Sequence, residues 1–196
     1  MGDGGGLLIV VSGPSGVGKT TITRRLRERF PDASFSVSAT TRPRTANETD
    51  GEDYHFLSED EFVARIGSGA FLEHVEYAGK RYGTLREPVE NIIRDGRLMI
   101  LDVDVRGGES VKEHMPEALA MFILPPSEEE PLRRLRDRQR EGEDLIQKRF
   151  SAAKQEIARA KGSGAYDAMI VNDDLEEAVR TAVGLVERAR GARASA

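Results

Sequence analysis

The sequence predicts an α/β protein built on a doubly wound parallel sheet that carries a smaller insertion of mixed structure. Two observations predict the sheet: short apolar runs of strand length recur along the chain, and segments with helical periodicity separate them. The third observation is the stretch 39–86, which interrupts this alternation with loop, strand and helix signals of its own. Ligands of a doubly wound sheet bind beyond the carboxyl ends of its strands, so the loops there are the first candidates for a functional site.

The strands of the core sheet are predicted from apolar runs that are too short to be buried helices. Strands that are covered on both faces contain near-continuous apolar residues rather than an alternating pattern. Such runs lie at residues 7–11, 35–38, 98–103, 119–124 and 168–171. The segments between them are long enough to hold the connecting helices.

Helices are predicted where apolar residues recur every three or four positions between recognisable end signals. Pro88 and Gly96 stand where one helix begins and ends. A capping-box pair, Ser127 and Glu130, precedes an Arg/Leu-rich helix. The last helix has the clearest pattern, a single apolar stripe formed by Leu175, Ala178, Val179, Ala182, Val183 and Val186.

Residues 39–86 depart from the alternation of strands and helices. They begin with the loop TTRPRTANETDGEDY, contain the strand candidate YHFL, and continue with a Ser58/Glu61 capping box that opens a short helix. The segment FLEHVEYAGKRYGT follows. We expect this stretch to form a small, partly β insertion on one side of the sheet.

The composition excludes several classes of protein. The 196 residues include no cysteine, so the chain has no disulfide framework, thiolate metal site or cysteine nucleophile. The net charge of −5, from 29 basic and 34 acidic residues, argues against a surface that coats nucleic acid. No apolar run approaches the roughly 20 residues of a membrane span, and the first run is too short for a secretory signal. We therefore expect a cytoplasmic protein with no membrane or nucleic-acid partner.

A phosphate-binding loop (P-loop) signature follows the first predicted strand. Residues 13–20 match the pattern G-x-x-x-x-G-K-[ST], and Ile22 and Leu26 mark a helix directly after them. Glycines let backbone N–H groups converge on phosphate oxygens at a helix N-terminus, where the helix dipole also favours anions. Lys19 adds a mobile positive charge, and the Thr20 hydroxyl can ligate Mg²⁺. The predicted ATP-binding residues of the loop are Gly13, Pro14, Ser15, Gly16, Val17, Gly18, Lys19 and Thr20.

The P-loop signature alone leaves kinase, ATPase, GTPase and motor activities open. A GTPase would carry a base-reading N-K-x-D motif, which this sequence lacks. The apolar run at 98–103 leads into two carboxylates, Asp102 and Asp104, at the end of a predicted strand. P-loop proteins usually hold a second metal-organising acid at such a position. We expect Asp102 to take this role.

Further informative segments follow the P-loop along the chain. They are SVSATTRPR, GEDYHF, FLEHVEYAGKRYGT, LDVDVRGG, RLRDRQREGEDLIQKRFSAA and IVNDD. Together with GPSGVGKT, their order and spacing resemble the guanylate kinase family, whose members transfer a phosphoryl group from ATP to GMP. The resemblance implies a P-loop nucleoside-monophosphate-kinase-like fold with a parallel sheet core, a small mixed α+β GMP-binding insertion and a helical lid. It assigns residues 1–38 and 87–196 to the core, about 131–150 of these to the lid, and 39–86 to the insertion.

The resemblance also implies a binding site for the phosphate of GMP. It places Ser38, Arg42, Tyr54 and Tyr82 around that phosphate. These residue types suit the task, because arginine offers a bidentate fork and tyrosine hydroxyls donate hydrogen bonds without adding charge.

The implied base site contains a carboxylate and a hydroxyl. Glu73 falls where the family holds guanine, and its carboxylate would accept from both the N1–H and the 2-amino group of that base. Adenine offers an acceptor and no amino group on the same edge. Thr84 replaces the serine that is commoner in the family, and Asp104 completes the pocket.

The implied lid carries arginines that reach the transferring phosphate. Arg138 and Arg149 match these family arginines, Arg134 is assigned to ATP, and Asn172 matches a contact on the adenine side. Phosphoryl transfer spreads negative charge over the equatorial oxygens, so positioned guanidinium groups and Mg²⁺ can carry most of the catalysis. The predicted catalytic residues are Lys19, Arg42, Arg138 and Arg149.

The chain departs from the family pattern in the acceptor loop. The family usually spaces its two acceptor arginines R-x-P-R, whereas Arg42, Pro43 and Arg44 stand one residue closer. Thr45 therefore occupies the usual position of the second arginine. Two arrangements are open: Arg44 turns inward and contacts the GMP phosphate despite the shift, or Thr45 holds the position and this phosphate contact is absent. We predict the inward Arg44, since a surface loop can absorb one residue of slippage.

Two alternatives from other classes stay open. A non-catalytic guanylate-kinase-like interaction domain would typically have a damaged P-loop, whereas residues 13–20 are intact. A related P-loop kinase of a phosphorylated sugar would keep that loop but would not need Glu73 and Thr84. For the leading interpretation we expect ATP with Mg²⁺ as the donor, GMP and also dGMP as acceptors, and a monomer or small homo-oligomer.

Overall fold

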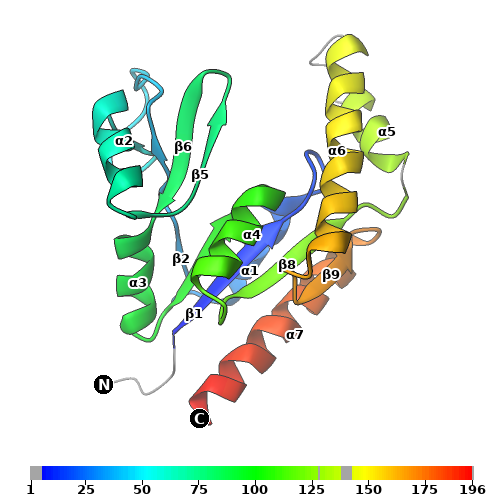
Figure 1. The fold of residues 1–196 in the computed structure, drawn as a ribbon. Coiled ribbons are helices and arrows are strands. Elements are labelled where there is room, and N and C mark those ends of the chain that lie inside the picture. The colour runs from blue at the N-terminus through cyan, green and yellow to red at the C-terminus, as the bar shows by residue number, and fades with distance from the viewer. Residues whose placement is uncertain (1–5, 128, 138–142, 196) are drawn as a thin grey trace.

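A computed structural model describes residues 6–127, 129–137 and 143–195 of the chain. The core is a five-stranded sheet in the order β2-β7-β1-β8-β9, and every neighbouring pair in it is parallel. Its strands are β1 (Leu7–Ser12), β2 (Ser34–Phe35), β7 (Leu98–Asp102), β8 (Leu119–Leu124) and β9 (Ala168–Val171). The α/β fold class with a parallel sheet that the sequence predicts is confirmed (Figure 1).

The first strand of the chain occupies the middle of this sheet. All six residues of β1 are buried, because helices cover both faces of a parallel sheet and both faces then need apolar side chains. One predicted strand is wrong in its bounds: it was expected at 35–38, whereas β2 ends at Phe35. Residues 36–38 instead lead the chain out of the core sheet toward a second sheet, in which Ala39 begins the next strand.

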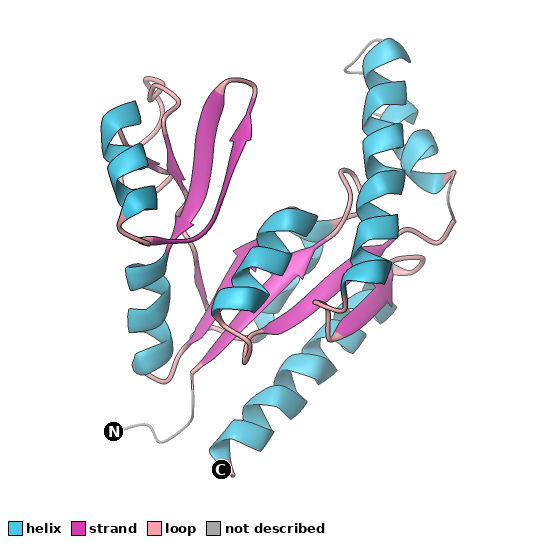
Figure 2. Cartoon of the chain, in the orientation of Figure 1, coloured by secondary structure: helices cyan, strands magenta, loops and turns pink. Residues whose placement is uncertain are grey.

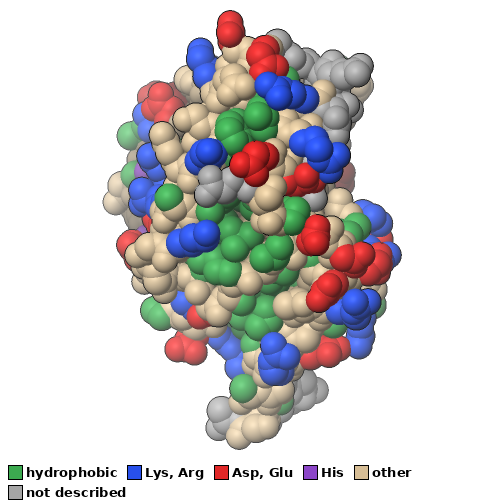
Figure 3. Space-filling model, turned by 90° about the vertical axis from the view of Figure 1, so that its right-hand side faces the viewer, with side chains coloured by type: hydrophobic (Ala, Val, Ile, Leu, Met, Phe, Trp, Pro, Cys, Tyr) green, Lys and Arg blue, Asp and Glu red, His purple; other side chains and the backbone are tan. Residues whose placement is uncertain are grey.

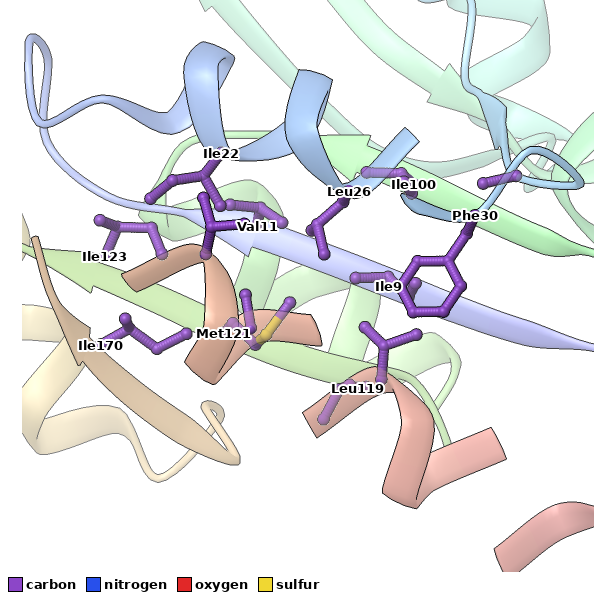
Figure 4. Packing of buried hydrophobic residues seen from close by; sticks show 14 of the residues in the cluster. Ile9, Val11, Ile22, Leu26, Phe30, Ile100, Leu119, Met121, Ile123 and Ile170 are labelled. Carbon is purple, nitrogen blue, oxygen red and sulfur yellow. The ribbon is translucent and has the colours of Figure 1, made fainter. Parts of the chain in front are cut away.

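Helices pack on both faces of the core sheet. Alternate β1 residues face opposite layers, so Ile9 lies in a cluster with Leu26 of the first helix (Figure 4), whereas Leu8 lies in a cluster on the other face with Val89 and Val111. The first face is covered by α1 (Lys19–Arg29) and α7 (Leu175–Ala194), and the second by α3 (Arg86–Arg94) and α4 (Val105–His114). The predicted stripe of the last helix is confirmed, with Ala178, Val179, Ala182 and Val186 buried.

The stretch between β2 and α3 forms a second, smaller sheet. Its strand order is β4-β3-β6-β5, and it combines a parallel pair with antiparallel pairs. Its elements are β3 (Ala39–Thr40), β4 (His55–Phe56), α2 (Glu59–Gly67), β5 (Phe71–Tyr77) and β6 (Lys80–Leu85). The predicted Ser58/Glu61 capping box is present in full at the start of α2. Phe62 of α2 stacks on Phe71 with ring centroids 4.4 Å apart, and this pair anchors the small core of the insertion.

Two further helices follow β8. They are α5 (Glu130–Asp137) and α6 (Glu143–Ser163). The hydroxyl of Ser127 accepts from the N–H of Glu130 at 3.2 Å, as the predicted capping pair requires. The insertion and these two helices stand on opposite sides of the core sheet (Figure 2), and the loop after β1 lies between them in the view of Figure 1. The exact division of the chain at 38/39 and 86/87 stays a prediction.

The β9 edge of the core sheet is partly apolar at its surface. Met169 and Val171 are 38% and 51% exposed, and hydrophobic side chains gather near the middle of this side of the molecule (Figure 3). Among the helices that the structure describes, none is long and apolar enough to cross a membrane.

Candidate functional site

The P-loop connects the central strand β1 to α1. Gly18 adopts φ +106° at the N-cap of α1, and a Cβ at this position would lie 2.5 Å from Asn172 Nδ2, so only glycine fits there. No side chain caps α1, and its first turn contains no acidic residue. The positive end of the helix dipole is therefore left for an anionic ligand. Lys19 Nζ lies close to the loop and donates to the carbonyl of Gly13 at 2.6 Å.

The side chain of Asn172 holds the P-loop by a hydrogen bond to its backbone. Its side chain is buried, with 5% of its surface exposed, and Nδ2 donates to the carbonyl of Val17 at 2.7 Å. Its backbone N–H donates to Leu124 at the end of β8. These bonds tie the loop to the strand edge. The predicted adenine contact of Asn172 stays a prediction beside this supporting role.

The two predicted metal-binding residues stand at the same edge of the sheet. Asp102 ends β7 and is paired in register with Val11 near the end of β1, so the parallel strands place its carboxylate beside the P-loop. Thr20 lies in the first turn of α1 and is exposed. The surrounding protein desolvates Asp102 and raises its pKa, while the charge of Lys19 pulls that pKa down. Asp102 is nevertheless exposed at the end of β7, so a cation can reach its carboxylate.

A buried carboxylate, Glu73, and an exposed one, Asp104, lie where the insertion meets the core. Glu73 is 7% exposed and accepts a hydrogen bond from the hydroxyl of Thr84 at 2.7 Å. Strands β5 and β6 pair these two residues directly. Asp104 caps α4 by accepting from the N–H of Gly107 at 2.7 Å. The predicted base-site residues Glu73, Thr84 and Asp104 therefore converge on the start of α4.

The absence of a side chain at Gly107 leaves space for the carboxylates of Glu73 and Asp104. A Cβ there would lie 3.2 Å from Glu73 Oε2 and 3.3 Å from Asp104 Oδ1, so the two carboxylates approach the same glycine. Burial raises the pKa of Glu73, and the nearby charge of Asp104 raises it further, against the hydrogen bond from Thr84. A buried, electron-rich edge of this kind can accept from paired N–H donors of a base.

The predicted phosphate contacts cluster in the insertion. The guanidinium carbon of Arg42 lies 5.2 Å from the ring centroid of Tyr54 and 5.6 Å from that of Phe56. The ring of Tyr82 meets Tyr54 edge-on, with centroids 6.2 Å apart. Ser38 stands just before β3, and its carbonyl accepts from the N–H of His55 at 2.9 Å. The structure thus brings Arg42, Tyr54 and Tyr82 together.

Sequence reasoning missed one residue in this cluster, Glu48. Its carboxylate accepts from Arg42 Nη1 at 3.0 Å and Nη2 at 2.5 Å. It also accepts from the N–H and the hydroxyl of Thr45, both at 2.8 Å. Arg44 is exposed and donates to the backbone carbonyl of Glu48 at 3.2 Å. The signal that could have identified Glu48 is its position as the single acid in the loop 43–49. The role of Arg44 toward the GMP phosphate stays a prediction.

One described arginine of the predicted lid contacts the P-loop. Arg149 of α6 donates from Nη2 to the hydroxyl of Ser15, so this helix contacts the loop directly. Arg138 lies outside the described residues, and the side chain of Arg134 in α5 lies outside them as well. The roles of these two arginines stay predictions from the sequence.

Comparison with known proteins matches one family over the part of the chain that contains all the candidate site residues. The model of the family described as guanylate kinase matches residues 6–189. The guanylate kinase of Anaeromyxobacter dehalogenans is 46% identical over 94% of this chain and 81% of its own length. That of Thermosynechococcus vestitus is 47% identical over 89% of this chain and 90% of its own length.

Solved structures agree with the sequence comparisons. The crystal structure of guanylate kinase from Anaplasma phagocytophilum superposes with a TM-score of 0.69 and 30% identity, covering 95% of this chain and 87% of that one. A protein from Eubacterium ventriosum shares the fold, with a TM-score of 0.53 at 12% identity over 93% of this chain and 98% of that one. The family model covers most of the chain, and relatives at 46–47% identity cover it as well, so the chain belongs to the guanylate kinase family.

Proposed function

We propose that this protein transfers the γ-phosphoryl group of ATP to GMP, and also to dGMP, producing ADP and the nucleoside diphosphate. The observation that carries the proposal is the buried carboxylate of Glu73, paired with Thr84 and next to Asp104. A phosphate loop is common to many enzymes, whereas this buried acceptor edge suits a base with two adjacent N–H donors. Membership of the guanylate kinase family supports the same activity.

The proposed donor side is the P-loop. Backbone N–H groups and Lys19 would hold the phosphates of ATP, and Mg²⁺ would be held by Thr20 with Asp102 nearby. The hard oxygen donors fit this ion, because Mg²⁺ in such sites takes one or two protein ligands together with phosphate oxygens and water. When bound, Mg²⁺ would neutralise charge on the donor phosphates.

The proposed acceptor site has one group of residues for the phosphate of GMP and another for its base. Arg42, Tyr54 and Tyr82 would bind the GMP phosphate with Ser38, and Arg44 would add a further charge. Glu73 would accept from guanine N1–H and the 2-amino group. Since all of these contacts address the base or the phosphate, removal of the ribose 2′-hydroxyl is expected to leave dGMP a substrate.

The proposed reaction needs no covalent intermediate with the protein. An oxygen of the GMP phosphate attacks the γ-phosphorus of ATP, and the bond from that phosphorus to the bridging oxygen of ADP breaks. Lys19, Arg138 and Arg149 would stabilise the charge that develops on the transferring group. Arginines on a lid would also exclude water, the competing acceptor. The contact between Arg149 and Ser15 supports this placement of α6 over the loop.

The proposed setting is the cytoplasm, with free nucleotides as the partners. The net charge of −5 disfavours a nucleic-acid partner, and the mixed charge of the surface fits small polar substrates that diffuse to the site.

A coupled assay tests the proposed function. The full chain is offered GMP, dGMP, AMP, UMP and ribose phosphates, each with ATP and Mg²⁺, and ADP release is measured. We expect turnover with GMP and dGMP and little with the others. Absence of turnover with GMP would refute the proposal. Turnover with the sugar phosphates would indicate the P-loop sugar kinase instead, and GMP binding without turnover would indicate the interaction domain.

A further inference from the structure

We propose that Glu48 is a positioning residue for the acceptor phosphate, which holds the guanidinium of Arg42 so that its second hydrogen-bonding edge faces GMP. The inference rests on the proposed function, because it takes Arg42 as a contact of the GMP phosphate. It adds a residue outside the predicted set and gives that residue a specific task.

The hydrogen bonds of Arg42 divide its guanidinium into a used edge and an unused edge. Nη1 and Nη2 each donate to one oxygen of Glu48, and Nη1 also donates to the carbonyl of Pro43 at 2.9 Å. A guanidinium has five N–H donors in a rigid plane. The two that these bonds leave, on Nε and on Nη2, lie side by side along one edge. No residue in the described part of the chain accepts from that edge.

The unused edge has the geometry that a phosphate requires. Two parallel N–H groups on one side of an arginine form the fork that binds a phosphate in bidentate fashion. Glu48 accepts along the adjacent Nη1–Nη2 edge, and each Nη carries two N–H groups, so a phosphate can bind the Nε–Nη2 edge without displacing Glu48. The carboxylate therefore supports the arginine rather than competing for the same donors.

Aromatic side chains also restrict the guanidinium of Arg42. Its central carbon lies 5.2 Å from the ring centroid of Tyr54 and 5.6 Å from that of Phe56. The bidentate bond to Glu48 fixes the direction of its Nη1–Nη2 edge. A side chain that is ordered before the ligand arrives loses less entropy on binding, which strengthens binding.

Glu48 is itself held in a defined position. The N–H and the hydroxyl of Thr45 both donate to its Oε2 at 2.8 Å. The hydrogen bonds from Arg42 and then from Thr45 lower the pKa of Glu48 to about 2. The carboxylate consequently stays ionised throughout the neutral range, and its hold on Arg42 is constant there.

The test is the Michaelis constant for GMP in the variant Glu48→Gln of the full chain, at saturating ATP and Mg²⁺. We expect KM for GMP to rise by about tenfold while kcat changes by less than about threefold, the scale expected when an arginine keeps its charge but loses its support. Glu48→Asp should recover part of the loss. The matched control is Glu59→Gln, which removes the carboxylate paired with Arg81 in the same insertion and should leave KM unchanged.

A double variant shows whether Glu48 acts through Arg42. Arg42→Ala should raise KM for GMP, and Arg42→Ala combined with Glu48→Gln should give the same KM as Arg42→Ala alone. A KM for Glu48→Gln equal to that of the wild type overturns the positioning role. A lower KM also overturns it, because that result would mean that Glu48 competes with the phosphate.

One further variant separates this positioning role from an effect on folding, and the variants above separate it from the proposed function. Thr45→Val removes only the hydroxyl bond to Glu48 and should raise KM in the same direction by a smaller factor, which keeps the test available if Glu48→Gln unfolds. Additive effects in the double variant would overturn the positioning role alone. If Arg42→Ala leaves KM for GMP unchanged, the assignment of Arg42 under the proposed function fails instead.

Discussion

The variant Glu73→Gln tests the proposed base site and a cost in stability that the same site imposes. The Glu73 side chain is 7% exposed, and burial, followed by the charge of Asp104, raises its pKa above the ordinary value of 4.5. A carboxyl group with a raised folded-state pKa contributes stability that is fully present below the unfolded pKa and lost as the pH rises through the folded pKa. At neutral pH the buried carboxyl of Glu73 therefore lowers the stability of the protein without ligand.

Glutamine has almost the same shape as glutamate and removes this loss of stability. Its amide oxygen can still accept from Thr84, and it carries no charge to repel Asp104. We expect Glu73→Gln to raise the melting temperature of the free protein at pH 7, by about 2–4 °C for each kcal/mol regained in a chain of this size. The gain should shrink as the pH falls toward the ordinary value of 4.5, because the raised pKa makes the wild-type carboxyl take up its proton above that pH. Differential scanning calorimetry at several pH values measures both effects.

The same substitution should damage the selection of guanine. An amide presents an N–H where the carboxylate presented an acceptor, so one of the two bonds to guanine is lost. A hydrogen bond to a charged group contributes about 1.5–3 kcal/mol, which corresponds to roughly 10–100-fold in kcat/KM. Turnover of AMP should not fall. We would measure kcat/KM for GMP and AMP in the coupled assay.

Two results would refute this reasoning. An unchanged ratio of GMP to AMP turnover would mean that Glu73 does not read the base. A melting temperature at pH 7 below that of the wild type would mean that the buried charge of Glu73 stabilises the fold. Thr84→Val is the matched control, since it removes the partner hydroxyl and leaves the charge in place.

Three other substitutions have defined outcomes. Gly108→Ala would place a Cβ 2.4 Å from the hydroxyl oxygen of Tyr166, so urea unfolding should show a loss of about 1–3 kcal/mol; unchanged stability would contradict this packing. Lys19→Ala should lower kcat by about 100-fold or more with a normal melting temperature, and a wild-type kcat would remove Lys19 from the reaction. Asn172→Ala loses the buried bond to Val17 and should cost about 1–3 kcal/mol of stability and raise KM for ATP; an unchanged KM would limit Asn172 to a structural role.

Local sequence patterns determined most of the secondary structure. The runs at 119–124 and 168–171 became strands with those bounds. The first is covered on both faces and is apolar at every position, whereas the second lies at the edge of the sheet and buries Ile170. The capping box of Ser58 and Glu61 formed as predicted, since its atoms lie within four consecutive residues. The run at 35–38 failed because the chain leaves one sheet for another within it, and apolar character alone does not distinguish the two sheets.

The P-loop and the family resemblance could also be identified from the sequence. The loop is eight consecutive residues, so the chemistry and the order of its parts are both visible in the sequence. Position at the end of a strand was enough to nominate Asp102, because all parallel strands of a sheet end at the same edge.

Only the tertiary structure decided which distant residues support one another. Asn172 lies 155 residues from Val17, and Arg149 lies 134 residues from Ser15. Glu73 and Asp104 meet at Gly107 only because the insertion packs on α4. Glu48 lies six residues from Arg42, but no periodic pattern in a loop predicts that its carboxylate turns back to that guanidinium. The periodicity of a segment indicates which of its own side chains are buried. These contacts depend instead on how separate segments pack against one another. The free energy of that packing cannot be predicted from any single segment.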